Sequence, residues 1–129
     1  MKQQTFTRPT ADSLLVINCE IDAHDLALAL DTEASHTTVD LAALIIAGYD
    51  ITKAERIIQI ETASGVIDAY VFKVKTFKAI STKKNNIEVC AYDFFSYHLI
   101  TDFDGVLGLD FFGEQKLCID FKNSLLTLQ

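Results

Sequence analysis

The sequence has no long hydrophobic run and no apolar leader segment. Its longest helix-like apolar stretch, LAALIIAG at residues 41–48, is far shorter than the roughly 20 residues that cross a bilayer. The first ten residues, MKQQTFTRPT, do not contain the apolar core of a signal peptide. From these absences we expect a soluble protein that is not exported and not bound to a membrane, with a cytoplasmic location.

Basic residues are also scarce. Lys and Arg number 11 against 18 Asp and Glu, which gives a formal net charge of −7. The longest basic run is the pair Lys83–Lys84. A phosphate backbone or an anionic lipid surface requires clustered positive charge. The composition therefore argues against nucleic acid and membrane surfaces as partners.

The cysteines and histidines form no pattern that is typical of a disulfide framework or a metal site. Cys19, Cys90 and Cys118 are odd in number, widely spaced and set in alternating apolar segments, where thiols behave as small hydrophobic groups. No ligand spacing such as His-x-x-x-His links the three histidines, His24, His36 and His98. We expect reduced, buried thiols, no metal and no cofactor; a cysteine nucleophile assisted by a histidine is the minor alternative.

The chain contains one proline, Pro9, and no linker, internal repeat or low-complexity segment. A length of 129 residues is sufficient for one buried core but not for two full domains. We expect a loose N-terminal arm over residues 1–12 and a single domain over residues 13–129.

Alternating hydrophobicity predicts a mostly β domain. Residues 15–22 and 26–30 alternate with period two, which predicts a hairpin that ends at Asp31. The same alternation predicts a hairpin with its tip at residues 62–65, strands at 77–82 and 87–92 joined by a polar turn at 83–86, a short strand at 106–107 and a last hairpin over 116–128.

Helical patterns are rare. One main helix is expected over about residues 38–47, capped by Thr37 or Thr38 and ended by Gly48. Its apolar positions follow the i, i+3, i+4, i+7 rule: Val39, Ala42, Ala43 and Ile46. A short helix is expected near residues 109–112.

Three motifs occur in an order that resembles a known family. LALD at residues 28–31 is followed by T-x-A-S at 32–35, TASG occupies 62–65 and GVLG occupies 105–108. They are similar to the Asp-Thr/Ser-Gly-Ala signature, the flap and the apolar-apolar-Gly element of the retropepsin-like aspartic proteases, the single-domain homodimeric relatives of pepsin. The resemblance covers roughly residues 13–128. It implies an all-β, closed-barrel-like acid protease fold of one lobe, assembled as a homodimer.

The resemblance implies hydrolysis of peptide bonds by an activated water. Two carboxylates forced together share one proton, so that one acts as the base and the other as the acid. The chain has one copy of the signature, so the second aspartate must be Asp31 of another copy across a two-fold axis. The implied partners are a second copy and a peptide or protein substrate. Taken alone, Asp31 is more typical of an acid that forms a turn at a strand end by accepting bonds from nearby backbone amides.

The resemblance also assigns roles to neighbouring residues. Thr32 would bond across the axis, and Ser35 would orient the carboxylate. The flap, residues 63–66, would close over an extended peptide that adds itself as a strand. The expected catalytic positions are Asp31, Thr32 and Ser35, and the expected substrate-binding positions are Glu33, Ala34, Ala63, Ser64, Gly65, Val66, Val106 and Leu107.

Glu33 stands where the family has glycine. Its side chain would enter the space beside the axis and the peptide, and would bring two further carboxylates close to the Asp31 pair. Three outcomes are open: an outward-turned Glu33 in a working, acid-requiring protease; a catalytically inactive dimeric peptide-binding module; or a site blocked until something moves. A cation site made by two Asp31 and two Glu33 carboxylates is a fourth, minor alternative.

Overall fold

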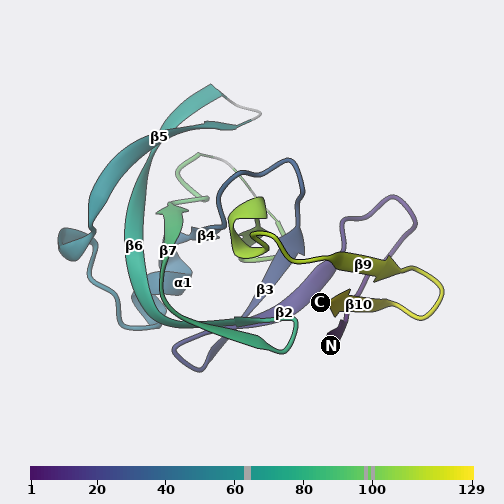
Figure 1. Ribbon diagram of the computed structural model, residues 1–129. Helices are drawn as coiled ribbons and strands as arrows, with labels where there is room; N and C mark the ends of the chain where they lie inside the picture. The colour runs from purple at the N-terminus through teal and green to yellow at the C-terminus, as the bar shows by residue number, and fades with distance from the viewer. Residues whose placement is uncertain (63–64, 98, 100) are drawn as a thin grey trace.

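The computed structural model describes residues 1–62, 65–97, 99 and 101–129, and these form a mostly β structure with little helix (Figure 1). No helix in this described part of the chain is long and apolar enough to cross a bilayer. The strands are β1 (Lys2–Thr5), β2 (Val16–Ile21), β3 (His24–Leu30), β4 (Thr38–Asp40), β5 (Arg56–Thr62), β6 (Gly65–Ala79), β7 (Thr82–Tyr92), β8 (Gly105–Leu107), β9 (Leu117–Asp120) and β10 (Leu125–Leu128). The helices are α1 (Leu41–Ile46) and the 3₁₀ turns η1 (Ile51–Lys53) and η2 (Leu109–Phe111).

Six strands close into a barrel. The order is β2-β3-β8-β4-β7-β6, and a short β2–β6 pairing closes the ring, while β5 extends the sheet beyond β6. The pairs β3–β8 and β4–β7 are parallel, and the other pairs of this sheet are antiparallel. The predicted all-β, closed-barrel fold is confirmed.

The predicted β2–β3 hairpin is confirmed, and its alternation explains its burial. Ile17, Cys19 and Ile21 point into the core, because successive side chains of a strand face opposite sides. The two-residue turn is Asp22-Ala23, whose φ angles of 49° and 66° are typical of a type I′ hairpin turn. This hairpin carries the chain directly to Asp31.

The long β5–β6 hairpin is also confirmed, but the connection after it differs from the prediction. β6 and β7 are joined by Ile80 and Ser81, with φ angles of 51° and 52°, and residues 83–86 lie within β7. The predicted polar turn at 83–86 is therefore wrong. Ile is not typical of positive φ, so the true turn carries no local sequence signal.

The main helix is shorter than predicted. It begins at Leu41, and Val39 belongs instead to β4, which pairs with both β7 and β8. These two pairings outweigh the local helical pattern. Leu41 and Leu44 form the buried face of α1, whereas Ala42 and Ile46 are exposed. The predicted apolar face is therefore wrong, while the short helix near 109–112 corresponds to η2.

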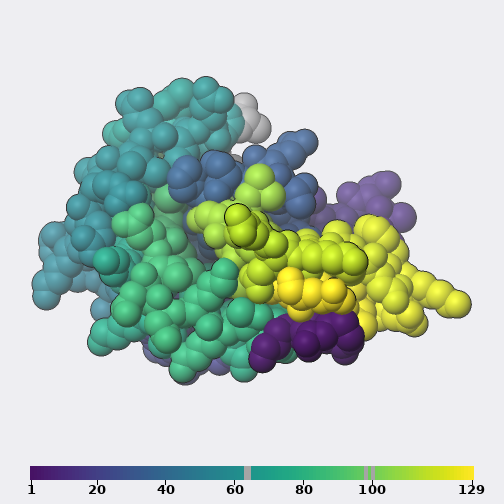
Figure 2. All heavy atoms as spheres, in the orientation of Figure 1, coloured from purple at the N-terminus to yellow at the C-terminus, as the bar shows by residue number. Residues whose placement is uncertain are grey.

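The N-terminal segment is not a loose arm. Strand β1 pairs with β10, which pairs on its other side with β9, and Phe6 beside β1 is buried in the core. We call these three strands the terminal sheet. The predicted β9–β10 hairpin is confirmed, and it projects from the body of the molecule (Figures 1 and 2).

Candidate active site

Asp31 lies where β3 leaves the barrel. The preceding residue, Leu30, is buried and pairs with Leu107 of β8. The Asp31 N–H donates to the Leu107 carbonyl at 3.1 Å, and the Asp31 carbonyl accepts from the Ala34 N–H at 3.1 Å. The Asp31 Oδ1 accepts from the Glu33 N–H at 3.0 Å. The segment between β3 and β4, residues 31–37, therefore fixes both the backbone and the carboxylate of Asp31, and we call it the Asp31 loop.

Two glycines lie where backbone segments approach closely, Gly105 against β4 and Gly108 against this loop. A Cβ atom on Gly105 would lie 2.2 Å from the Thr38 carbonyl oxygen, and one on Gly108 would lie 2.6 Å from the His36 carbonyl carbon. Both distances are too short for any side chain, so the close backbone approach requires glycine. The first glycine of the GVLG motif thus allows β8 to lie close to β4, and the last allows the chain after β8 to lie close to the Asp31 loop.

A polar cluster fixes the far end of the same loop. The Asp110 Oδ1 accepts from the Thr37 N–H at 2.9 Å and from the Thr37 hydroxyl at 2.8 Å, and the Thr37 Oγ1 accepts from the Gly108 N–H at 3.1 Å. Thr37 is 2% exposed. We call this arrangement the Thr37–Asp110 clamp. It joins the Asp31 loop to η2 across 73 positions of sequence.

Asp31 lines a cavity of about 540 Å³. Its walls come from the Asp31 loop, from β5, from β7 and the segment that follows it, and from β8. The lining residues are Asp31, Glu33, Ala34, Thr38, Ile60, Glu61, Thr62, Tyr92, Phe94, Leu99, Phe103 and Val106. The cavity is mainly apolar and aromatic with a few carboxylates, which is typical of sites that bind apolar side chains and orient them by polar groups.

The electrostatics of the cavity are dominated by acidic groups. Glu33 and Glu61 line both this cavity and an adjoining groove of about 450 Å³. Burial, followed by the charge of Asp40, raises the pKa of the Tyr92 phenol, so Tyr92 is a neutral hydrogen-bonding group at ordinary pH. Within the described ranges, no three His, Cys, Asp or Glu side chains come together to hold a metal ion.

The backbone at Glu33 does not require glycine. Glu33 is not among the residues with positive φ, and its side chain is exposed. A single chain therefore accommodates Glu33 without strain. Any conflict that Glu33 causes must arise when a second chain or a peptide approaches the loop.

Four of the eleven predicted site residues line one cavity. Asp31, Glu33, Ala34 and Val106 line the main cavity. Leu107 is different: it is 0% exposed and packs in the core, so its predicted role in substrate binding is wrong. It lies on the opposite face of β8 from Val106, because successive residues of a strand alternate.

Thr32 and Ser35 lie on the exposed side of the Asp31 loop. The Ser35 hydroxyl is 2.8 Å from His36 Nδ1 and lines the adjoining groove. The contact to the Asp31 carboxylate comes from the Glu33 amide instead. This differs from the expectation that Ser35 orients the carboxylate.

The expected flap is only partly described. Gly65 and Val66 begin β6 and are exposed, whereas Ala63 and Ser64 lie outside the described residues, as does His98. The opposite arm of the hairpin contributes Glu61 and Thr62 to the cavity that holds Asp31. The end of β5 thus faces the same cavity as the Asp31 loop.

Sequence reasoning did not identify the aromatic wall or the clamp. Tyr92, Phe94 and Phe103 come from an aromatic segment whose local pattern resembles any buried strand. Thr37 appears in the sequence only as a helix cap, and Asp110 as an acid in the first turn of a short helix. The sequence shows only that an acid, Asp110, follows Gly108 by two positions. It does not show which residue Asp110 contacts.

The chain matches known aspartic proteases in sequence pattern and in fold. A family model described as aspartyl protease matches residues 17–111, which is more than half of the chain. No curated protein sequence matches significantly. The structure is similar to a retropepsin-like aspartic protease from Rickettsia conorii, with a TM-score of 0.69 and 20% identity over 98% of this chain and 89% of that chain. It is also similar to the EIAV protease in complex with the inhibitor HBY-793, with a TM-score of 0.58 and 18% identity over 81% of this chain and 90% of that chain. The chain therefore belongs to the aspartyl protease family and has the retropepsin-like fold.

Proposed function

We propose that the protein is an aspartic endopeptidase whose active site forms between two copies of the chain. Asp31 of each copy supplies one carboxylate of the catalytic pair. The observation that carries the proposal is the position of Asp31: a carboxylate held by the Glu33 amide at the wall of an apolar cavity, in a chain of the aspartyl protease family.

The chemistry follows from two carboxylates at hydrogen-bonding range. Both cannot ionise at that distance, so the pair holds one proton. The ionised partner removes a proton from a water, which attacks the carbonyl carbon of the peptide bond, and the protonated partner hydrogen-bonds to the carbonyl oxygen and gives it the proton. Collapse of the resulting tetrahedral species, with proton transfer to the nitrogen, breaks the C–N bond.

The substrate is an extended peptide with apolar side chains. Tyr92, Phe94, Leu99, Phe103 and Val106 give the cavity a surface for large hydrophobic groups. The β5–β6 hairpin acts as the flap that covers the peptide and excludes water. Thr32 bonds across the two-fold axis and holds the two loops in register.

A second function, peptide binding without cleavage, is favoured by one observation. Glu33 is exposed beside Asp31 and lines the same cavity. In the dimer, two Glu33 carboxylates would add negative charge next to the Asp31 pair and occupy space close to the peptide. In this alternative the protein is a dimeric peptide-binding module that Glu33 has made inactive.

A peptide library distinguishes the two functions. The protein is incubated with a mixed library of peptides over a mildly acidic pH range, beside Asp31→Ala and Glu33→Gly, and the products are identified by mass spectrometry. Cleavage by the unmodified protein that disappears in Asp31→Ala supports the endopeptidase and rejects the binding-only function. Cleavage by Glu33→Gly alone supports the binding module. Cleavage that survives Asp31→Ala contradicts both.

A further inference from the structure

The chain between β7 and β8, residues 93–104, supplies three side chains to the cavity that holds Asp31: Phe94, Leu99 and Phe103. We call this segment the β7–β8 connection. In the part of it that the structure describes there is no helix or strand. Without a ladder of backbone hydrogen bonds to fix it, the position of this cavity wall must depend on individual contacts.

The Phe94 side chain packs in a small hydrophobic cluster that is separate from the main core. Phe94 is 6% exposed, and the centroid of its ring lies 4.7 Å from that of Tyr92. Ile67 and the partly buried Ile60 complete the cluster. Because the cluster is small, packing alone gives this wall little rigidity.

Asp40, the last residue of β4, contacts both ends of the connection. The Asp40 Oδ1 accepts from the Phe94 N–H at 3.2 Å, and the Asp40 N–H donates to the Asp104 carbonyl at 2.7 Å. Asp104 is also bonded to β3, because its Oδ2 accepts from the Ala27 N–H at 2.8 Å and its N–H donates to the Ala27 carbonyl at 2.7 Å. The end of the connection therefore has several bonds to the barrel.

The start of the connection depends on Asp40 alone. Among the described residues, the other hydrogen bonds of residues 93–97 stay within the connection. Two of them pass the position of Phe94 onward: its carbonyl accepts from the Leu99 N–H at 2.9 Å and from the Tyr97 N–H at 3.2 Å. A shift of the Phe94 backbone would therefore move Leu99 as well, and with it a second part of the cavity wall.

We propose that Asp40 is a positioning residue of the peptide-binding cavity, whose carboxylate holds Phe94 and the wall around it in place beside the Asp31 loop. This inference rests on the proposed function, in which the cavity takes apolar side chains of a peptide. Thr38, at the other end of β4, lines the cavity directly, so one short strand joins the Asp31 loop to this wall. A fixed wall favours a large side chain that fills the cavity, and a displaced wall discriminates less between large and small ones.

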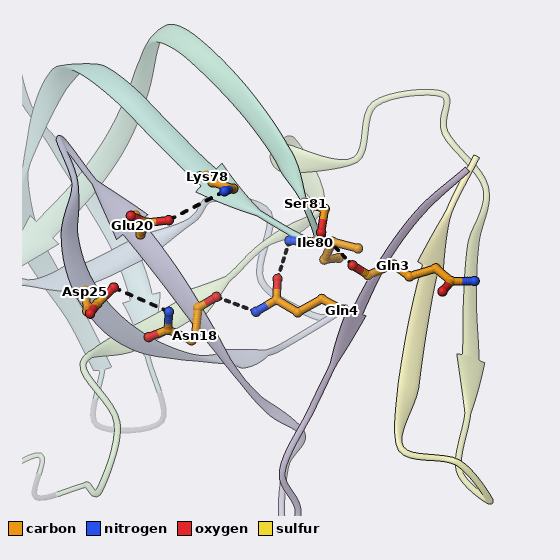
Figure 3. A network of polar contacts seen from close by, with 8 residues as sticks. All are labelled: Gln3, Gln4, Asn18, Glu20, Asp25, Lys78, Ile80 and Ser81. Atoms are coloured by element: carbon orange, nitrogen blue, oxygen red, sulfur yellow. Dashed lines mark hydrogen bonds and ion pairs between the residues drawn. The ribbon is translucent and has the colours of Figure 1, made fainter.

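Three variants separate this role from general effects on stability. Asp40→Ala removes the acceptor of the Phe94 N–H but keeps the backbone bond to Asp104. Asp40→Asn keeps an oxygen that can accept from the same N–H while it removes the charge, so it distinguishes position from electrostatics. Gln4→Ala is the matched control outside the cavity, since the Gln4 Oε1 accepts from the N–H of the buried Ile80 at 2.6 Å, as Figure 3 shows.

Selectivity between two peptides is the readout. The best peptide of the library is made with Phe or with Ala next to the cut, the two forms compete in one tube, and the ratio of their kcat/KM values is measured. This ratio does not depend on the amount of active protein. We expect Asp40→Ala to lower the Phe-to-Ala ratio about tenfold, mainly through KM, while Asp40→Asn and Gln4→Ala stay within about twofold of the unmodified protein.

The outcomes distinguish this inference from the proposed function. If Asp40→Ala keeps the full preference for the Phe peptide, the role of Asp40 is wrong while the proposed function stands. An equal loss of preference in Gln4→Ala would show a general effect of destabilisation and would also overturn the role of Asp40. If the unmodified protein neither cleaves nor binds either peptide, the proposed function fails and this inference fails with it.

Hydrogen exchange provides a readout that does not depend on activity or on the folding of a variant. In the unmodified protein, the amides of Phe94 and Ile80 should both exchange slowly, because each is bonded to a side-chain oxygen. Asp40→Ala should make the Phe94 amide fast and leave the Ile80 amide slow, whereas Gln4→Ala should do the reverse. Fast exchange of the Phe94 amide in unmodified protein whose Ile80 amide is protected would overturn the inference.

Discussion

The Thr37–Asp110 clamp should make a measurable contribution to stability, and Asp110→Ala tests it. The substitution removes the acceptor of the Thr37 N–H and of the Thr37 hydroxyl, both of which lie on a residue that is 2% exposed. A buried polar group left without a partner costs about 1–3 kcal/mol. Asp110 itself is exposed, so water can enter the vacated position and replace part of the lost bonding. We therefore expect Asp110→Ala to lower the free energy of unfolding by about 1–3 kcal/mol in total, against about 5–15 kcal/mol for a typical domain.

The assay is urea unfolding followed by circular dichroism, at one protein concentration because a dimer's stability depends on concentration. Asp110→Asn is the matched control. The asparagine keeps one oxygen that can accept from Thr37. Its free energy of unfolding should therefore fall by about half as much as that of the alanine variant. Since the clamp holds the loop that carries Asp31, the cleavage rate should fall in the same order. An alanine variant within about 0.5 kcal/mol of the unmodified protein would refute the role of the clamp.

Three further predictions concern other parts of the chain. Glu33→Gly should raise the cleavage rate about tenfold or more, equivalent to about 1.4 kcal/mol of transition-state stabilisation, while lowering stability by no more than about 1 kcal/mol; an unchanged rate would show that Glu33 does not limit catalysis. Leu107→Ala should cost about 2–5 kcal/mol of stability, whereas Val106→Ala should mainly weaken peptide binding, and equal unfolding midpoints for the two would contradict their opposite facing. Burial raises the pKa of Cys19 to about 12 and is the largest cause of the rise for Cys90 to about 11, so the folded chain retains protons that the unfolded chain releases. Stability should therefore fall as pH rises from about 9 towards 11, and rapid labelling of both thiols in the folded protein at neutral pH would contradict their burial.

The order of motifs in the sequence was sufficient to predict the fold class and the position of Asp31 at the end of a strand. The β2–β3 alternation predicts that Asp31 lies at the end of a strand, and the GVLG motif predicts a short buried strand that enters a tight turn. These features depend on side-chain period and on glycine geometry, both of which are visible within a few residues of sequence.

The incorrect structural predictions fall where contacts between residues far apart in the sequence decide the local structure. Val39 fits a helix locally, yet β4 forms because β7 and β8 lie on either side of it. Ile80 and Ser81 adopt the turn because the β6–β7 register requires it, although the polar residues after them are the better turn formers. The partner of Thr37 lies 73 positions away, and no local pattern predicts such a contact.

The shared catalytic pair is the central claim, and mixed dimers test it most directly. The unmodified protein is mixed with Asp31→Asn, which keeps the size of the side chain, at constant total concentration and with time for subunits to exchange. If two copies share one site, activity should follow the square of the unmodified fraction, so that an equal mixture retains about a quarter of the starting rate. A linear dependence, with about half the rate at equal mixing, would show that each chain has its own site and would contradict the proposal.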